Sequence, residues 1–130
     1  MTEQVLVTMT VDTEEEWDWD GPFPVAGASV GNTLRLPAFQ DLCARYGMRA
    51  TYFTNLAVLQ EDVSRRVIQQ LARRDDAEVG MHIHPWHTPP LAAFRGSPAR
   101  ASFLHNHPPE VARAKLETVY SAFRDAGIAP

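Results

Sequence analysis

The sequence is poor in the features that mark several classes of protein. Its single cysteine, Cys43, excludes an internal disulfide, and nothing beside it indicates a catalytic nucleophile. No apolar run approaches the roughly 20 residues that a membrane helix needs. The net charge of −4, with dispersed basic residues, gives no electrostatic footprint for nucleic acid. The first residues carry an acid where a signal peptide has basic residues. These absences predict a cytoplasmic protein with no nucleic-acid or membrane partner.

The residues that are present predict one globular domain over residues 1–130, built from alternating strands and helices. Hydrophobic residues make up 45% of the sequence, which is enough for a single core. Alternation with a period of two predicts strands, and apolar residues three or four apart predict helices. The expected strands cover 5–12, 49–58 and 78–84, and the expected helices cover 36–47, 63–74 and 108–127.

Each expected helix carries an apolar stripe that should face the core. For the first and last helices the predicted stripes are Phe39, Leu42, Cys43 and Tyr46, and Leu116, Val119, Tyr120 and Phe123. Gly47 and Gly127 end these two ranges, at the position where a glycine commonly caps the C-terminus.

The order of strands and helices predicts a parallel sheet with right-handed crossovers. A complete (β/α) barrel usually takes about 250 residues. Three strand–helix units therefore predict an α/β fold in which parallel units form a partial, incomplete (β/α) barrel. Such a barrel leaves at least one strand edge unpaired, which predicts a homo-oligomer that covers the open edge of the sheet.

Acidic and imidazole side chains gather at the ends of the first and third expected strands. Asp12 and Glu14 are two residues apart, as are His82 and His84, so each pair shares one side of an extended backbone. If both strands turn their apolar side to the helices, the two pairs meet at the carboxyl edge of the sheet. Two imidazoles and a carboxylate form a three-ligand set of the kind that holds catalytic zinc or another divalent ion. His87 competes with His84 as the second histidine ligand.

The carboxylate that does not bind the metal is placed to act as a general base toward water, and Asp12 and Glu14 can exchange these two roles. The long loops that follow the two strands carry Trp17, Trp19 and Trp86. These tryptophans border the expected cleft, where Trp17 and Trp86 are candidates for binding a sugar ring by stacking. Hydrophobic anchoring of the loops is the other interpretation of the same residues.

Four segments resemble the polysaccharide deacetylases, the carbohydrate esterase family with the NodB homology domain. TMTVDTEEEW (8–17) resembles the first motif of that family, and GMRATYFTNLAVL (47–59) resembles its second strand. DDAEVGMHIHPWHTPPL (75–91) resembles its histidine motif. FLHNHPPEVARAKLETVYSAFRDAGIAP (103–130) is similar to the helix before its third motif. The resemblance covers nearly the whole sequence and implies the N-terminal half of a deacetylase barrel.

The resemblance implies a metal-dependent hydrolase that removes N-acetyl or related acyl groups from a carbohydrate. In this sequence it makes Asp12 the general base, while Glu14, His82 and one further histidine hold the metal. Zinc is the expected ion, with nickel, iron or cobalt as alternatives. A histidine would protonate the leaving amine.

Two departures from the family pattern bear on this expectation. The usual metal histidines stand four residues apart, whereas the spacings available here are two or five. The arginine, aspartate and general-acid histidine of the later motifs are not found in these 130 residues. The deacetylase hypothesis therefore expects activity to require further strands or a partner that supplies them.

Two other hypotheses fit the same residues. In the first, the chain is a catalytically inactive remnant that binds metal or sugar and acts through self-association. In the second, it belongs to another class of metallohydrolase with a His-x-His pair, although those folds generally carry the pair on their first strand.

Overall fold

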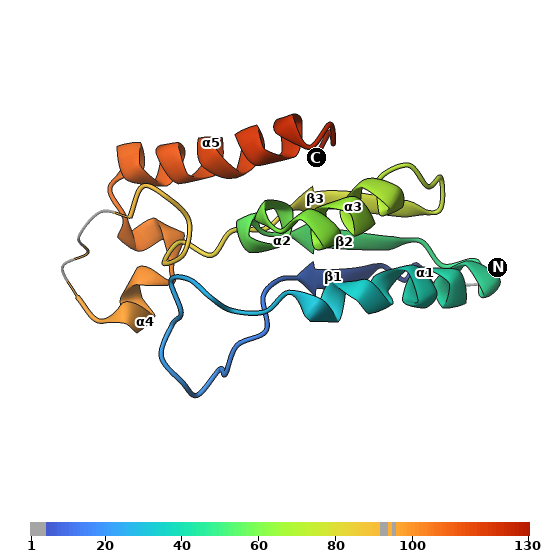
Figure 1. Ribbon diagram of the computed structural model, residues 1–130, viewed down its shortest axis with the longest axis horizontal. Coiled ribbons are helices and arrows are strands. Elements are labelled where there is room, and N and C mark those ends of the chain that lie inside the picture. Colours follow the sequence, from blue (N-terminus) through green and yellow to red (C-terminus); the bar gives the residue numbers. More distant parts are fainter. Residues whose placement is uncertain (1–4, 92–93, 95) are drawn as a thin grey trace.

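The computed structural model describes residues 5–91, 94 and 96–130, and places three parallel strands beside a set of helices (Figure 1). The strands are β1 (Met9–Thr13), β2 (Ala50–Thr54) and β3 (Ala77–Met81), in the order β1-β2-β3. Asp12, Phe53 and Gly80 are partners across the sheet. The expected mixed α/β fold with parallel strands is therefore confirmed.

The strands begin or end at residues other than those predicted. The first strand starts at Met9 because its neighbour starts at Ala50, the partner of Met9, and residues 5–7 are at least 80% exposed. The third strand ends at Met81, so its two histidines follow the strand. The His82 N–H still donates to Thr54 O at 2.9 Å, which extends the strand pairing by one bond.

The helices include four short elements that the sequence periodicity did not predict. The 3₁₀ helix η1 covers Gly31–Arg35, and the others are α1 (Leu36–Arg45), α2 (Leu56–Gln60), α3 (Asp62–Leu71), α4 (Pro98–Ala101), η2 (Leu104–Asn106) and α5 (Pro109–Asp125). No described helix is long and apolar enough to cross a membrane.

The strand predicted over residues 49–58 is in fact a strand followed by a helix. The Asn55 side chain accepts a hydrogen bond from the Val58 N–H at 3.3 Å and so caps the N-terminus of α2. Leu56, Val58 and Leu59 are all buried, and a short run that is apolar on every side has no period to separate strand from helix. The prediction of a continuous strand was wrong for this reason.

The core lies on one face of the sheet. Tyr52 and Val79 point into it from the strands, and Ile68, Val119 and Phe123 fill it from α3 and α5. The three inward side chains of β2 are buried, whereas its other two side chains are only partly buried. The second face of the sheet therefore remains open in the described part of the chain. Side chains on this face lie along the strands toward their carboxyl ends.

Two predicted helix faces were wrong in part. In α1, Cys43 is buried as predicted, but Phe39, Leu42 and Tyr46 are 36%, 49% and 74% exposed. Gln40 occupies the buried side instead, because its amide accepts from the Tyr52 hydroxyl and donates to Asp76 O, both at 2.7 Å. These two bonds satisfy the polar group that burial would otherwise leave unpaired.

In α5 the buried row consists of Lys115, Val119 and Phe123, which are four residues apart. The predicted members Leu116 and Tyr120 are 40% and 54% exposed. The helix is rotated because Lys115 has hydrogen-bond partners inside the protein, described below. Gly47 and Gly127 have φ values of 66° and 70°, which confirms that both helices end in the left-handed conformation that glycine adopts at low cost.

The rotation of α5 predicts a large difference between two aromatic substitutions one turn apart. Phe123→Ala should lower the free energy of unfolding by about 3–5 kcal/mol, because it leaves a cavity in the core. Tyr120→Ala should change it by no more than about 0.5 kcal/mol, because that side chain is exposed. Urea denaturation followed by circular dichroism measures both. Equal effects of the two substitutions would contradict this orientation of the helix.

Candidate metal centre

The carboxyl ends of β1 and β3 bring together three side chains from distant parts of the chain. Glu14 is the first residue after β1, His82 is the first after β3, and His84 follows two residues later. Backbone hydrogen bonds to the residue after β2 and within the loop after β3 fix these positions. The Asn55 N–H donates to Thr13 O at 3.1 Å, and the Thr88 N–H donates to His84 O at 2.9 Å. The predicted meeting of the two strand ends is confirmed.

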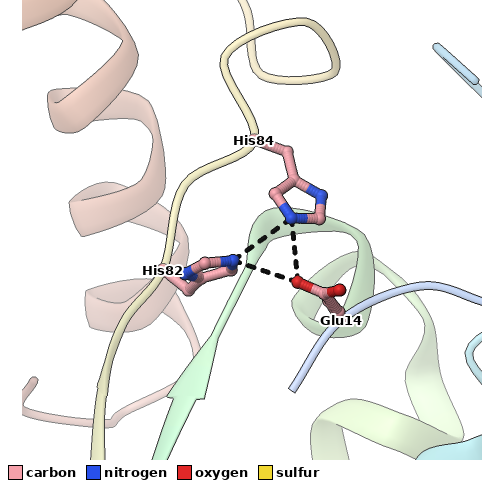
Figure 2. A group of neighbouring side chains, drawn as sticks. All are labelled: Glu14, His82 and His84. Atoms are coloured by element: carbon pink, nitrogen blue, oxygen red, sulfur yellow. Dashed lines mark hydrogen bonds and ion pairs between the residues drawn. The ribbon is translucent and has the colours of Figure 1, made fainter. Parts of the chain in front are cut away.

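The three side chains point their ligand atoms toward one another (Figure 2). Glu14 Oε2 lies 3.0 Å from His82 Nε2 and 2.9 Å from His84 Nε2. The two Nε2 atoms are 3.1 Å apart. Donors bonded at about 2.0–2.1 Å to one ion lie about 2.9–3.4 Å apart for octahedral to tetrahedral angles. The residues present therefore fit a single first-row divalent ion.

Three donors on one side of an ion leave its other coordination positions open. The side chain of His82 is 27% exposed and that of Glu14 is 14% exposed, whereas His84 is 4% exposed. Solvent therefore reaches the group from the side of His82 and Glu14. An open position is what distinguishes a catalytic metal site from a closed structural one.

Behind His84 lies a second carboxylate, which the sequence did not single out. His84 Nδ1 is 2.8 Å from Glu15 Oε1, and the Glu15 side chain is 1% exposed. Asn55 Nδ2 donates to the other oxygen of the same carboxylate. Burial alone would raise the pKa of Glu15, but the hydrogen bonds from His84 and Asn55 outweigh it and lower the pKa to about 2. Glu15 is thus ionised and paired inside the protein.

The tryptophans form a wall beside the histidines. The Trp86 ring stacks on His84 with centroids 4.2 Å apart, and its Nε1 donates to Pro24 O at 3.1 Å. Trp17 packs against Trp86 at 5.4 Å, and Trp19 packs against Trp17 while remaining 70% exposed. Trp86 therefore fastens the loop after β3 to the loop after β1. Whether Trp17 and Trp86 also bind a sugar stays a prediction.

His87 and Asp12 lie apart from the three converging donors. His87 does not belong to the cluster of His84, and together with Glu15 and Gln60 it lines a separate cavity of about 300 Å³. Burial lowers the pKa of His87. Asp12 is exposed on the open face of the sheet, two residues before Glu14. The structure thus brings His84, rather than His87, to the side of His82.

Lys115 is a further residue that the sequence analysis missed. Its Nζ donates to Pro85 O, Thr88 O and Pro90 O at 2.8, 2.6 and 2.8 Å. Burial lowers the pKa of Lys115, but three accepting carbonyls match the three N–H groups of an ammonium. Lys115 is the only lysine in the sequence, and it stands four and eight residues before Val119 and Phe123. This spacing was the one signal in the sequence that it lies on the buried side of the helix.

No protein-family model, curated protein or solved structure matches this chain. The function proposed below therefore depends on the geometry of the cluster and on the motifs in the sequence.

The three bonds of Lys115 predict that it holds the histidine loop in place. Lys115→Met keeps the length of the side chain but leaves buried carbonyl oxygens unpaired, at about 1–3 kcal/mol for each. We expect a loss of at least about 3 kcal/mol in the free energy of unfolding. We also expect faster hydrogen exchange at the amides of His87 and Thr88, which bond to His84 O. Arg113→Met, on the exposed side of α5, serves as the control and should change neither.

Proposed function

We propose that this chain binds a divalent metal ion, zinc in the first place, through Glu14, His82 and His84. We propose further that it acts as a metal-dependent hydrolase that removes N-acetyl or related acyl groups from a carbohydrate. The observation that carries the proposal is the convergence of one carboxylate oxygen and two imidazole nitrogens within 3.1 Å. Metal binding requires both Nε2 atoms to be unprotonated, and a cation between them and the carboxylate oxygen would then offset their mutual repulsion.

The fold supports the same proposal. Three parallel strands, joined through helices that cover one face, are what the first half of a (β/α) barrel of the polysaccharide deacetylase type requires. The candidate site lies at the carboxyl ends of the strands, where barrels of this kind carry their active sites. The motif resemblance around Asp12 and around the two histidines points to the same family.

In the proposed reaction a divalent cation supplies Lewis-acid polarisation of the acyl carbonyl. Glu14, His82 and His84 hold that cation. Asp12, exposed on the same face of β1 that leads to Glu14, takes a proton from the water that attacks the acyl carbon. A carbon–oxygen bond forms, the carbon–nitrogen bond breaks, and the amine leaves with a proton. The resemblance assigns that last proton to a histidine of a later motif, which residues 1–130 do not contain.

One observation favours the alternative of an inactive chain that binds metal or sugar and self-associates. In the described residues β1 and β3 each pair with β2 alone, so each has one unpaired edge. Unpaired edges invite a second chain. A dimer or larger species in sedimentation velocity that binds zinc but releases no acetate would support this alternative over the hydrolase.

The proposed ligands predict one metal ion per chain and its loss on substitution. Isothermal titration of the metal-free protein with Zn²⁺ should give a stoichiometry of one. Glu14→Ala and His82→Ala should each weaken binding by more than about 100-fold, the upper end of the loss found for outer-sphere partners of a metal. His105→Ala, which changes an exposed histidine of η2, should bind like the unaltered chain. Equal affinity in all four proteins would refute the site.

The proposed base predicts that binding and catalysis can be separated. The zinc-loaded protein is incubated with N-acetylated glucosamine oligomers, and released acetate is measured. Asp12→Asn should keep the affinity for zinc within about threefold while lowering the rate of acetate release by about 100-fold or more, the range of general-base catalysis. A rate that does not change would remove Asp12 from the mechanism.

A further inference from the structure

We infer that Glu15 is a positioning residue that fixes the tautomer of His84 and thereby prepares the metal site. The inference rests on the proposed function, since it concerns how one of the proposed ligands is oriented. Glu14 and Glu15 are neighbours in sequence but contact opposite nitrogens of the same ring. Glu14 Oε2 lies 2.9 Å from Nε2, and Glu15 Oε1 lies 2.8 Å from Nδ1.

The chemistry of the two partners decides which nitrogen of His84 carries hydrogen. His84 Nδ1 lies 2.8 Å from Glu15 Oε1 and 3.2 Å from Asn55 Nδ2. The Glu15 carboxylate only accepts hydrogen bonds, and its contact is the shorter of the two, so we place the hydrogen on Nδ1, pointing at Glu15. A neutral imidazole has one N–H, so Nε2 then keeps its lone pair. That lone pair is aimed at Glu14 Oε2 and His82 Nε2, where the cation is proposed to lie. A carboxylate behind a metal-binding histidine is a common way to set its tautomer.

Asn55 in turn fixes Glu15. Its Oδ1 accepts from the Val58 N–H at the start of α2, so its Nδ2 must be the atom that faces Glu15 Oε2. The amide cannot turn over without losing the cap of the helix. The hydrogen bonds therefore run from α2 through Asn55 to Glu15, and the cap of the helix fixes the direction of the bond between Asn55 and Glu15.

This order predicts that glutamine cannot replace Glu15 despite its equal size. With its oxygen toward His84, the amide nitrogen of Glu15→Gln would face the nitrogen of Asn55, donor against donor. With its nitrogen toward His84, it would donate to Nδ1 and move the ring hydrogen to Nε2, the proposed metal-binding atom. The second arrangement satisfies both contacts and is the one we expect, and it weakens the site because Nε2 then lacks a lone pair for the metal.

The same logic supplies a matched rescue. Asn55→Asp still caps α2, because aspartate is as good an N-cap as asparagine, and it accepts from the nitrogen of the new glutamine. The glutamine oxygen then faces His84 Nδ1 again. The double variant Glu15→Gln/Asn55→Asp thus keeps the net charge, reverses the bond between residues 15 and 55, and restores donation from His84 Nδ1 to residue 15.

The experiment measures the tautomer and the metal affinity separately. Two-bond ¹⁵N–¹H correlation spectra of the metal-free protein, recorded at about pH 9 where an ordinary imidazole is neutral, report which nitrogen of His84 is protonated. We expect the Nδ1–H form in the unaltered chain, the Nε2–H form in Glu15→Gln, and the Nδ1–H form again in the double variant. Zinc affinity should fall about 10–100-fold in the single variant and return to within about threefold in the double variant. Glu16→Gln, at an exposed neighbouring carboxylate, should behave like the unaltered chain.

The outcomes distinguish this inference from the proposed function. An Nε2–H tautomer in the unaltered chain overturns the inference, whether or not Glu15→Gln folds. Zinc binding that is tight in the unaltered chain and equally tight in Glu15→Gln also overturns it, while leaving the proposed metal site intact. Failure of the unaltered chain to bind zinc, together with the expected tautomers, overturns the proposed function and leaves the role of Glu15 toward His84 standing.

Discussion

The alignment of the three strand ends is the constraint on which the candidate site depends. β1, β2 and β3 end at the same level, because Thr13, Thr54 and Met81 are partners across the sheet. The next residue of each strand therefore emerges at one edge, and these residues are Glu14, Asn55 and His82. A shift of the register by one residue would turn each of these side chains to the opposite face of the sheet. The acid and the imidazoles meet because the two sheet pairings hold.

Because successive side chains point to opposite sides of an extended backbone, Glu14 and Glu15 contact different nitrogens of His84. Glu14 faces the solvent-accessible side of His84, and Glu15 faces its buried side. Trp86 covers one face of the same ring at 4.2 Å. His84 is therefore restrained at both nitrogens and at one face, whereas His82, at 27% exposure of its side chain, is the more open of the two imidazoles.

The sequence predicts those parts of the fold and of the candidate site that depend on contacts between residues close together in the chain. The spacing of Asp12, Glu14, His82 and His84 is informative because a period of two follows from the geometry of a single extended strand. The parallel order of the strands follows from the alternation of strands and helices. The parallel strands and the convergence of Glu14, His82 and His84 were predicted correctly, whereas the role of Asp12 stays a prediction.

The parts that the sequence could not supply depend on contacts across the fold. Glu15 is one of three consecutive glutamates, and only the end point of β1 decides which of them faces His84 Nδ1. Lys115 is a charged residue on the side of α5 that is otherwise apolar. Its three carbonyl partners lie in a loop 25–30 residues earlier in the chain. Gln40 is buried for a similar reason, through Tyr52 and Asp76. Hydropathy places such residues at the surface, although internal partners hold them inside.

The balance of charge around His84 favours a doubly charged ion over a singly charged one. The carboxylates of Glu14 and Glu15 lie at the two nitrogens of one ring, and the Glu15 side chain is only 1% exposed. Buried or half-buried charges are costly unless an opposite charge compensates them nearby. A proton shared by the two imidazoles would compensate one of the two charges, whereas a divalent cation held by Glu14, His82 and His84 compensates both. In the proposed site the buried carboxylate would thus favour a divalent cation.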